Sequence, residues 1–246
     1  METFIHDTEG EELNQYQSCL DVRYPCGLAT YDDEMAGNQL GTVALFGGGP
    51  FVGNDEIDRL LIRGRTGPVG VLPTADAFEQ PQLLVASAEQ WGARLGVEVV
   101  PIMSMTRAQS SDSSFVSVVD SLEMLWLVGD SPIHLRTALK DTPLWESILG
   151  LLDRGGLVAA VGASAAAMCD PMTDPRGGAF TFGLGLVEGL AILTESEKWA
   201  TEQLQRAQHL SVEAPLIELP TGAAIVLDRS RGEWERYGDV TVHGDW

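Results

Sequence analysis

A serine lies among small residues directly after an apolar run, and this pattern could supply a nucleophile. Residues 156–161 read Gly-Leu-Val-Ala-Ala-Val, and residues 162–167 read Gly-Ala-Ser-Ala-Ala-Ala. A serine at a sharp turn from a buried strand into a helix has its hydroxyl exposed above the sheet. The pattern therefore predicts Ser164 as a nucleophile, with the N–H of Ala165 facing a developing oxyanion. Small-residue turns also serve packing alone, and residue 166 is alanine where the usual pattern has glycine.

Continuous apolar runs separated by helical patterns place this serine in an α/β fold. Runs typical of strands buried on both faces lie at residues 42–46, 69–73, 124–128 and 156–161, and a further strand is expected at residues 97–100. Helical patterns lie at residues 83–95, 132–139, 144–152 and 199–210. Later strands are expected at residues 190–193 and 223–227, with a terminal hairpin formed by residues 234–237 and 240–243. The alternation predicts three layers around a mostly parallel sheet, whose carboxyl edge would carry the functional groups.

The first 40 residues differ from the rest of the chain in composition and in hydrophobic periodicity. They are rich in acidic residues and lack periodicity, whereas the apolar runs begin after Gly41. We therefore expect residues 1–40 to form an N-terminal extension of low order and residues 41–246 to form one α/β domain. The extension has neither the basic start nor the apolar run of a secretory signal, and no stretch approaches the roughly 18 apolar residues of a membrane span. A cytoplasmic location is the expectation.

The formal net charge of −21 over 246 residues restricts the classes of partner. Nucleic acids and anionic membranes would be repelled, so neither is expected to bind. A basic peptide, a cation or a basic protein surface would be attracted, although solubility alone also accounts for an acidic surface.

The residues that usually bind metals or nucleotides are not arranged for that purpose. Cys19, Cys26 and Cys169 form no paired spacing, and the four histidines show no ligand spacing, so no metal site is expected. Residues 47–50 read Gly-Gly-Gly-Pro, which lacks both the dinucleotide fingerprint and the lysine of a phosphate-binding loop. This glycine run is better explained as a tight turn that lets the backbone approach a ligand. No cofactor is expected.

Five short stretches, in a fixed order, carry a resemblance to a known family. They are Leu-Phe-Gly-Gly-Gly at residues 45–49, Leu-Pro-Thr-Ala at 72–75, Val-Gly-Asp-Ser at 128–131, Gly-Ala-Ser-Ala-Ala-Ala-Met at 162–168 and Gly-Leu-Gly-Leu at 183–186. Together they resemble the cyanophycinase and aspartyl dipeptidase family of serine peptidases, whose fold is like that of class I glutamine amidotransferases. Residues 171–180 are similar to a branch of uncharacterised actinobacterial members. The resemblance extends over residues 41–243.

The resemblance implies roles for residues near the expected carboxyl edge of the sheet. Ser164 sits at the nucleophile position, and the N–H groups of Gly129 and Ala165 sit where the family has its oxyanion hole. Asp130 falls where the family has Asp or Asn, whereas a serine replaces the glutamine that usually follows. Apart from the resemblance, Arg176 is the cation near the elbow that could hold a carboxylate of a ligand.

The partners that such a serine needs depart from the family pattern. The family's catalytic histidine follows the Gly-Leu-Gly-Leu stretch, and Glu195 occupies that position when the sequence is aligned on Trp199. The family's supporting acid corresponds to Thr221. A serine hydroxyl is a poor nucleophile without a base to accept its proton, and the base needs a third group to orient it. Among the histidines, His134 is a better substitute base than His209 because it follows the expected oxyanion turn.

Two functions fit these residues. The first is a peptidase-like domain that keeps an accessible Ser164 but has lost its histidine and acid, does not hydrolyse, and uses its pocket for binding or assembly. The alternative is an active serine hydrolase of peptides or amides that uses Ser164 with an unusual base, Glu195 or His134. We favour the first because two independent partners are replaced. The expected partner is a small peptide or a protein, which the charge allows to be basic, and a homodimer is also open.

Overall fold

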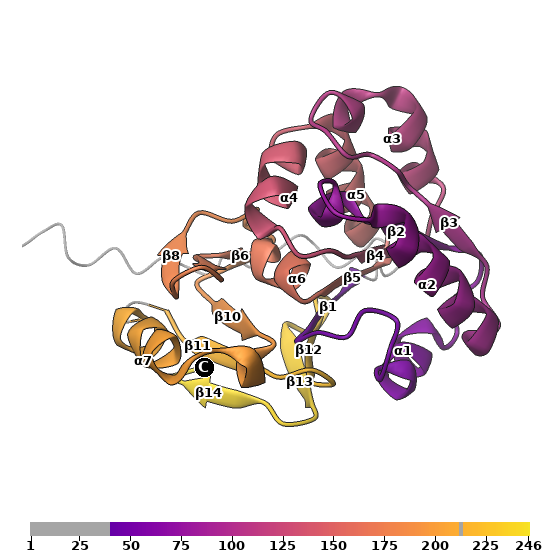
Figure 1. The fold of residues 1–246 in the computed structure, drawn as a ribbon. Coiled ribbons are helices and arrows are strands. Elements are labelled where there is room, and N and C mark those ends of the chain that lie inside the picture. The colour runs from indigo at the N-terminus through magenta and orange to yellow at the C-terminus, as the bar shows by residue number, and fades with distance from the viewer. Residues whose placement is uncertain (1–39, 212–213) are drawn as a thin grey trace, which may run out of the picture. The chain divides into compact units, whose positions relative to one another are not determined.

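A seven-stranded sheet forms the centre of the fold in the computed structural model, which describes residues 40–211 and 214–246 (Figure 1). The strands are β1 (Thr42–Phe46), β2 (Val69–Leu72), β3 (Val99–Pro101), β4 (Met124–Leu127), β5 (Leu157–Val161), β12 (Ala224–Asp228) and β13 (Glu233–Tyr237). Their order is β13-β12-β1-β5-β4-β2-β3. The pairs among β1 to β5 are parallel, whereas β12 and β13 are antiparallel to their neighbours. The predicted mostly parallel sheet is confirmed.

Helices cover both faces of this sheet and make it the middle of three layers. The helices are α1 (Asp55–Ile62), α2 (Pro81–Leu95), α3 (Ser113–Asp120), α4 (Pro132–Leu139), α5 (Pro143–Asp153) and α6 (Ala163–Met168). Successive side chains of a strand point to opposite faces, so β1 contributes to two cores. Val43 and Leu45 pack in one core with residues of α3, α4, α5 and α6. Ala44 and Phe46 pack in the other with residues of α1 and α2.

A smaller sheet follows in the C-terminal third of the chain. It consists of β10 (Ala191–Thr194), β11 (Leu216–Leu219) and β14 (Thr241–His243), and α7 (Thr201–Leu210) packs against it (Figure 1). Two short ribbons precede it, formed by β6 (Cys169–Asp170) with β9 (Val187–Glu188) and by β7 (Met172–Asp174) with β8 (Ala179–Thr181). Three single-turn helices complete the elements: η1 (Thr74–Asp76), η2 (Gln109–Ser111) and η3 (Ser196–Lys198).

The C-terminal hairpin is present, but its strands differ from the predicted pair. β12 and β13 form the hairpin, with Asp228 opposite Glu233. The segment predicted as the second arm, β14, instead pairs antiparallel with β11 of the smaller sheet. Gly238 has a φ of 73° in the turn between β13 and β14, where the chain leaves one sheet for the other. Pairing with β14 covers an edge of β11 that would otherwise present free backbone groups.

Two expectations concern parts of the chain beyond the sheets. The N-terminal extension predicted for residues 1–40 lies, apart from Leu40, outside the described residues. None of the helices over residues 40–211 and 214–246 combines the length and the apolar character needed to cross a bilayer.

Candidate functional site

The turn between β5 and α6 has its sharp corner at Gly162. This residue has φ 61° and ψ −132°, a conformation that L side chains rarely adopt and glycine adopts readily. Its N–H donates to the carbonyl of Phe46 at 3.0 Å, which ties the corner to the neighbouring strand β1. No described atom lies within 4 Å of where a Cβ of Gly162 would be. The corner therefore faces open space but carries no side chain.

Ser164 lies two residues beyond this corner and is fully buried, at 0% exposure. Its Oγ donates a hydrogen bond to the carbonyl of Gly129 at 3.2 Å. The expectation of an accessible hydroxyl is therefore wrong. The physical reason is that Ser164 already belongs to the first turn of α6, which packs against α4, so the side chain enters the core and not the space above the sheet. The N–H of Ala165 is also engaged, since it donates to the carbonyl of Gly162 at 2.9 Å.

The loop after β4 packs closely on η1 and brings two carboxylates to the same edge. Gly129 has a φ of 118°, and a Cβ there would lie 2.5 Å from the backbone nitrogen of Asp76. Ser131 N–H donates to the carbonyl of Ala75 at 2.9 Å. Burial raises the pKa of Asp130, and the negative charges of Asp76 and Glu195 raise it further. Glycine at position 129 is thus what allows Asp130 and Asp76 to lie near each other.

Glu195 directly follows β10 and lies beside the glycine run. Its backbone is left-handed, with φ 49° and ψ 42°, which is uncommon for a residue with a side chain. Its N–H donates to the carbonyl of Gly47 at 2.8 Å, and a Cβ at Gly48 would lie 2.6 Å from the Glu195 Cγ. The side chain accepts a hydrogen bond from Lys198 Nζ at 2.5 Å, and this ion pair raises the pKa of Lys198. The carboxylate at the expected histidine position is therefore held by a cation.

Thr221 lies on the other side of Gly48 and is paired with a different acid. A Cβ at Gly48 would lie 3.1 Å from the Thr221 Oγ1. That hydroxyl donates to Glu197 Oε1 at 2.6 Å, and the Thr221 N–H donates to Oε2 at 3.2 Å. Burial acts to raise the pKa of Glu197, but the hydrogen bonds from Thr221 and from the Glu197 backbone, together with the charge of Lys198, lower it overall. The structure thus brings Glu195 and Thr221 together, each bound to a polar neighbour.

The histidines in the described part of the chain do not hydrogen bond to Ser164. His134 Nε2 lies 2.8 Å from the carbonyl oxygen of Met105, and its ring packs edge-on against Phe78 with centroids 4.6 Å apart. His243 Nε2 lies 2.6 Å from Glu218 Oε1, and His209 is exposed on α7.

Arg176 lies in the loop between β7 and β8 and is paired with Asp174. Its Nη2 lies 2.7 Å from Asp174 Oδ2, and hydrogen bonds from Arg176 lower the pKa of that carboxyl. Arg176 lines a cavity of about 440 Å³ together with Asp130 and His134. Its expected role toward a carboxylate of a ligand stays a prediction.

A cleft of about 610 Å³ opens at the carboxyl edge of the sheet, where α/β folds usually bind ligands. It is lined by the β1–α1 loop, η1, the start of α2, the loop after β4 and η3. Its ionisable lining consists of Asp76, Glu79, Asp130, Glu195 and Lys198. Among the residues that the structure describes, no group of three or more histidine, cysteine or acidic side chains is arranged to hold a metal ion. We call this cavity the carboxyl-edge cleft.

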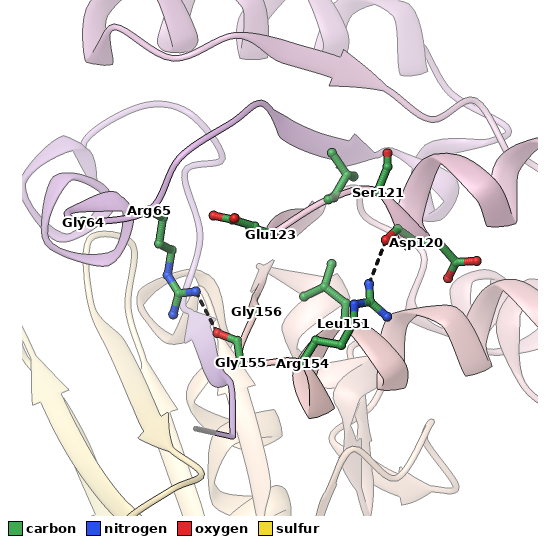
Figure 2. A pocket seen from close by; sticks show the side chains of 10 residues that line it. Gly64, Arg65, Asp120, Ser121, Glu123, Leu151, Arg154, Gly155 and Gly156 are labelled. Atoms are coloured by element: carbon green, nitrogen blue, oxygen red, sulfur yellow. Dashed lines mark hydrogen bonds between the residues drawn. The ribbon is translucent and has the colours of Figure 1, made fainter. Parts of the chain in front are cut away.

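A second cavity lies at the opposite edge of the sheet (Figure 2). Its arginines are engaged with backbone oxygens: Arg65 donates to the carbonyl of Gly155 at 2.9 Å, and Arg154 donates to that of Asp120 at 3.2 Å. Glu123 accepts a hydrogen bond from the N–H of Thr66, next to Arg65. Because its arginines bind backbone oxygens of the fold, this cavity belongs to the packing between the starts of the strands. We therefore take the carboxyl-edge cleft as the candidate functional site.

Comparison with solved structures places this architecture among peptidases. A peptidase from an acI-B1 Actinobacterium matches with a TM-score of 0.75 and 24% identity, over 84% of this chain and 92% of that chain. The chain has the fold of that peptidase. A putative peptidase E protein from Listeria monocytogenes EGD-e matches with a TM-score of 0.59 and 14% identity, over 82% of this chain and 98% of that one. No protein-family model and no curated protein matches the sequence.

Several residues of the candidate site were not singled out from the sequence. Gly162 is the corner of the turn, Asp76 and Lys198 line the cleft, and Glu197 binds Thr221. The positive φ of Gly162 leaves no trace in the sequence, because residues 162–167 are all small and any of them could form the corner. Asp76 directly follows the Leu-Pro-Thr-Ala stretch, and a polar residue just after a parallel strand often lies in the functional site, so the sequence could have indicated Asp76.

Proposed function

We propose that this chain is a peptidase-like domain that binds a ligand in its carboxyl-edge cleft without hydrolysing it. The observation that carries the proposal is the burial of Ser164, whose hydroxyl donates to the carbonyl of Gly129 inside the fold. A nucleophile must reach the carbonyl carbon that it attacks, and a general base must lie within hydrogen-bond reach of its proton. Ser164 meets neither requirement in this arrangement.

The rest of the site supports the same conclusion. In a nucleophile elbow the reactive side chain stands on the strained corner residue, and here that residue is Gly162, which has no side chain. The carboxylate of Glu195 is bound to Lys198, and Thr221 is bound to Glu197, so neither stands as a free base or as an orienting acid. Without these groups, the gain of about a hundred- to ten-thousandfold from general-base catalysis is absent.

The finer parts of the proposal rest on the sequence. The five ordered stretches support descent from peptidases like cyanophycinase and aspartyl dipeptidase, with loss of the catalytic triad. We keep the cytoplasm as the proposed location. A homodimer is compatible with a role in binding or assembly.

Labelling and hydrolysis test this proposal directly. The wild-type protein is incubated with a fluorophosphonate and separately with aspartyl dipeptides, and the protein mass and the peptide products are measured. We expect neither a mass increase nor cleavage above the rate in buffer. Ser164→Ala is the matched control. Hydrolysis by the wild type that this variant loses while keeping its fold would overturn the proposal and favour the active hydrolase.

A further inference from the structure

Asn54 and Asp58 lie one turn apart on α1, and each has a buried oxygen without a partner. Asn54 directly precedes the helix and is 3% exposed, and Asp58 is 2% exposed. The N–H of Asp58 donates to the carbonyl of Asn54 at 2.9 Å, so the two residues are spaced as neighbours on the helix surface. No described group donates to Asn54 Oδ1 or to Asp58 Oδ1. Two such buried acceptors without a donor are costly and require an explanation.

The other end of the Asn54 amide holds the glycine run beside the carboxyl-edge cleft. Its Nδ2 donates to the carbonyl of Gly48 at 3.0 Å and to that of Gly49 at 3.1 Å. Two carbonyl acceptors require the NH₂ group of the amide at this position, because the amide oxygen cannot donate. Gly49 lines the cleft, and a Cβ at Gly48 would lie 2.6 Å from the Glu195 Cγ. The orientation of the Asn54 amide therefore helps to fix one wall of the cleft.

The loop that follows the glycine run is strained and depends on contacts that hold it. Phe51 has a φ of 64°, which is rare for a residue with a bulky side chain. Its ring packs against Trp91 with centroids 5.3 Å apart, and its carbonyl accepts a hydrogen bond from Arg94 Nη2 at 2.7 Å. A strained conformation persists only while the surrounding contacts determine it. This loop is therefore able to change shape when the Asn54 contacts change.

The surroundings of Asp58 favour its neutral form. Its Oδ2 accepts a hydrogen bond from Trp91 Nε1 at 2.8 Å. Burial raises the pKa of this carboxyl to about 6, against the opposing effects of the Trp91 and Trp126 indoles. The charged groups that act on it are Asp55 on the same helix, which raises the pKa further, and Arg94 on α2, which lowers it. Protonation converts the unpartnered oxygen of the carboxyl from an acceptor into a donor.

We propose that Asp58 and Asn54 form a pH-sensitive switch that sets the shape of the glycine run at the carboxyl-edge cleft. In the protonated state the Asp58 Oδ1–H donates to Asn54 Oδ1, so one proton satisfies both unpartnered oxygens. When this proton leaves to solvent, two acceptors oppose each other, and the Asn54 amide rotates so that Nδ2 donates to the carboxylate. The carbonyls of Gly48 and Gly49 then lose this donor, and the strained loop relaxes. The effect of this change on ligand binding rests on the proposed function of the cleft.

An NMR titration of the ¹⁵N-labelled protein from about pH 4.5 to about pH 8 tests the switch. The Trp91 indole N–H reports the charge of Asp58, and the backbone N–H groups of Gly48 and Gly49 report the shape of the loop. We expect the three signals to shift with one common midpoint near pH 6. In Asp58→Asn a side-chain NH₂ replaces the proton as a permanent donor, so all three signals should stay constant over this range. Glu56→Gln, an exposed change on the same helix, is the matched control and should titrate like the wild type.

A second variant removes the link between the carboxyl and the loop. In Asn54→Ala the Trp91 signal should still titrate, because Asp58 remains buried. Its midpoint should fall by roughly half to one pH unit, because the protonated form loses its acceptor. The signals of Gly48 and Gly49 should no longer follow it. The titration of the wild type and of Asp58→Asn decides the matter even where Asn54→Ala does not fold.

The possible outcomes separate the switch from the proposed function. A Trp91 signal that titrates without the two glycine signals would overturn the switch, because the carboxyl and the loop would then be uncoupled. A Trp91 signal that stays constant would overturn it as well, because Asp58 would not change its charge. Glycine signals that still titrate in Asp58→Asn would show that another group moves the loop. None of these signals depends on a ligand or on Ser164, whereas cleavage of an aspartyl dipeptide contradicts the proposed function alone.

Discussion

Asp58 provides a quantitative prediction, because it is a carboxylate buried on α1 with an incomplete set of partners. It is 2% exposed, its Oδ2 accepts a hydrogen bond from Trp91 Nε1 at 2.8 Å, and no described group donates to its Oδ1. Burial raises the pKa of Asp58 to about 6 from its ordinary value of 3.8, against the opposing effect of the Trp91 hydrogen bond. The nearby charge of Asp55 acts in the same direction as burial, and that of Arg94 opposes it.

The raised pKa makes Asp58 a source of pH-dependent stability. Between pH 3.8 and about pH 6 the folded state holds a proton that the unfolded state has released, so the free energy of unfolding falls as the pH rises. The difference between the two pKa values corresponds to about 3 kcal/mol, at 1.36 kcal/mol for each pH unit. This stability is fully present below pH 3.8 and is lost above about pH 6.

Asp58→Asn should remove this dependence while keeping the size of the side chain and an oxygen for Trp91. We expect the free energy of unfolding of the variant, relative to wild type, to rise by about 2.5 kcal/mol between pH 4 and pH 7. Urea unfolding at a series of pH values measures it. Glu56→Gln, an exposed change on the same helix, is the control and should follow the wild type. Parallel curves for Asp58→Asn and wild type over this range would refute the reasoning.

Two further changes test the site. Ser164→Ala should lower the free energy of unfolding by about 1 kcal/mol, because the carbonyl of Gly129 loses its donor; urea unfolding that matches the wild type would contradict this hydrogen bond. Gly162→Ser combined with Glu195→His and Thr221→Glu should introduce fluorophosphonate labelling at residue 162. A serine with the positive φ of residue 162 should cost about 1–2 kcal/mol of stability. The control variant, which carries Glu195→His and Thr221→Glu alone, should remain unlabelled. Labelling of Ser164 in either variant, detected by peptide mass mapping, would contradict its burial.

The central sheet could be predicted because its strands leave a local signal. The run from Thr42 to Phe46 is continuously apolar since both faces of β1 are covered, and the structure has a strand at these five residues. The pattern at residues 132–139 likewise coincides with α4. α1 was not predicted, because most of its residues are polar or charged and only one side of it packs on the core. The partner of β14 could not be read either, since pairing with a strand some 25 residues away depends on packing and not on a turn sequence.

The site was predicted less well than the fold because its geometry depends on where β5 ends. Residues 162–167 are all glycine, alanine or serine, so their sequence does not mark which one forms the corner. The pairing of Phe46 with Val161 ends the strand one residue before Gly162, and this pairing decides that Ser164 falls within the helix. The resemblance assigned Glu195 to the histidine position and Thr221 to the acid position, and both lie beside Gly48. Their partners Lys198 and Glu197 could not be predicted, because the turn of η3 sets them.

The pairing of β14 with β11 has a consequence for how the C-terminus can be altered. β11 has β10 along one edge and β14 along the other, and β10 leads directly into Glu195. Truncation before Thr241 would expose the backbone of β11 and make it a template for strand addition between molecules. The loss of pairing at β11 would also disturb β10 and, through it, the position of the Glu195 carboxylate in the cleft. An affinity tag is therefore better appended after Trp246 than used to replace the last strand, even though that strand lies far along the sequence from every cleft residue.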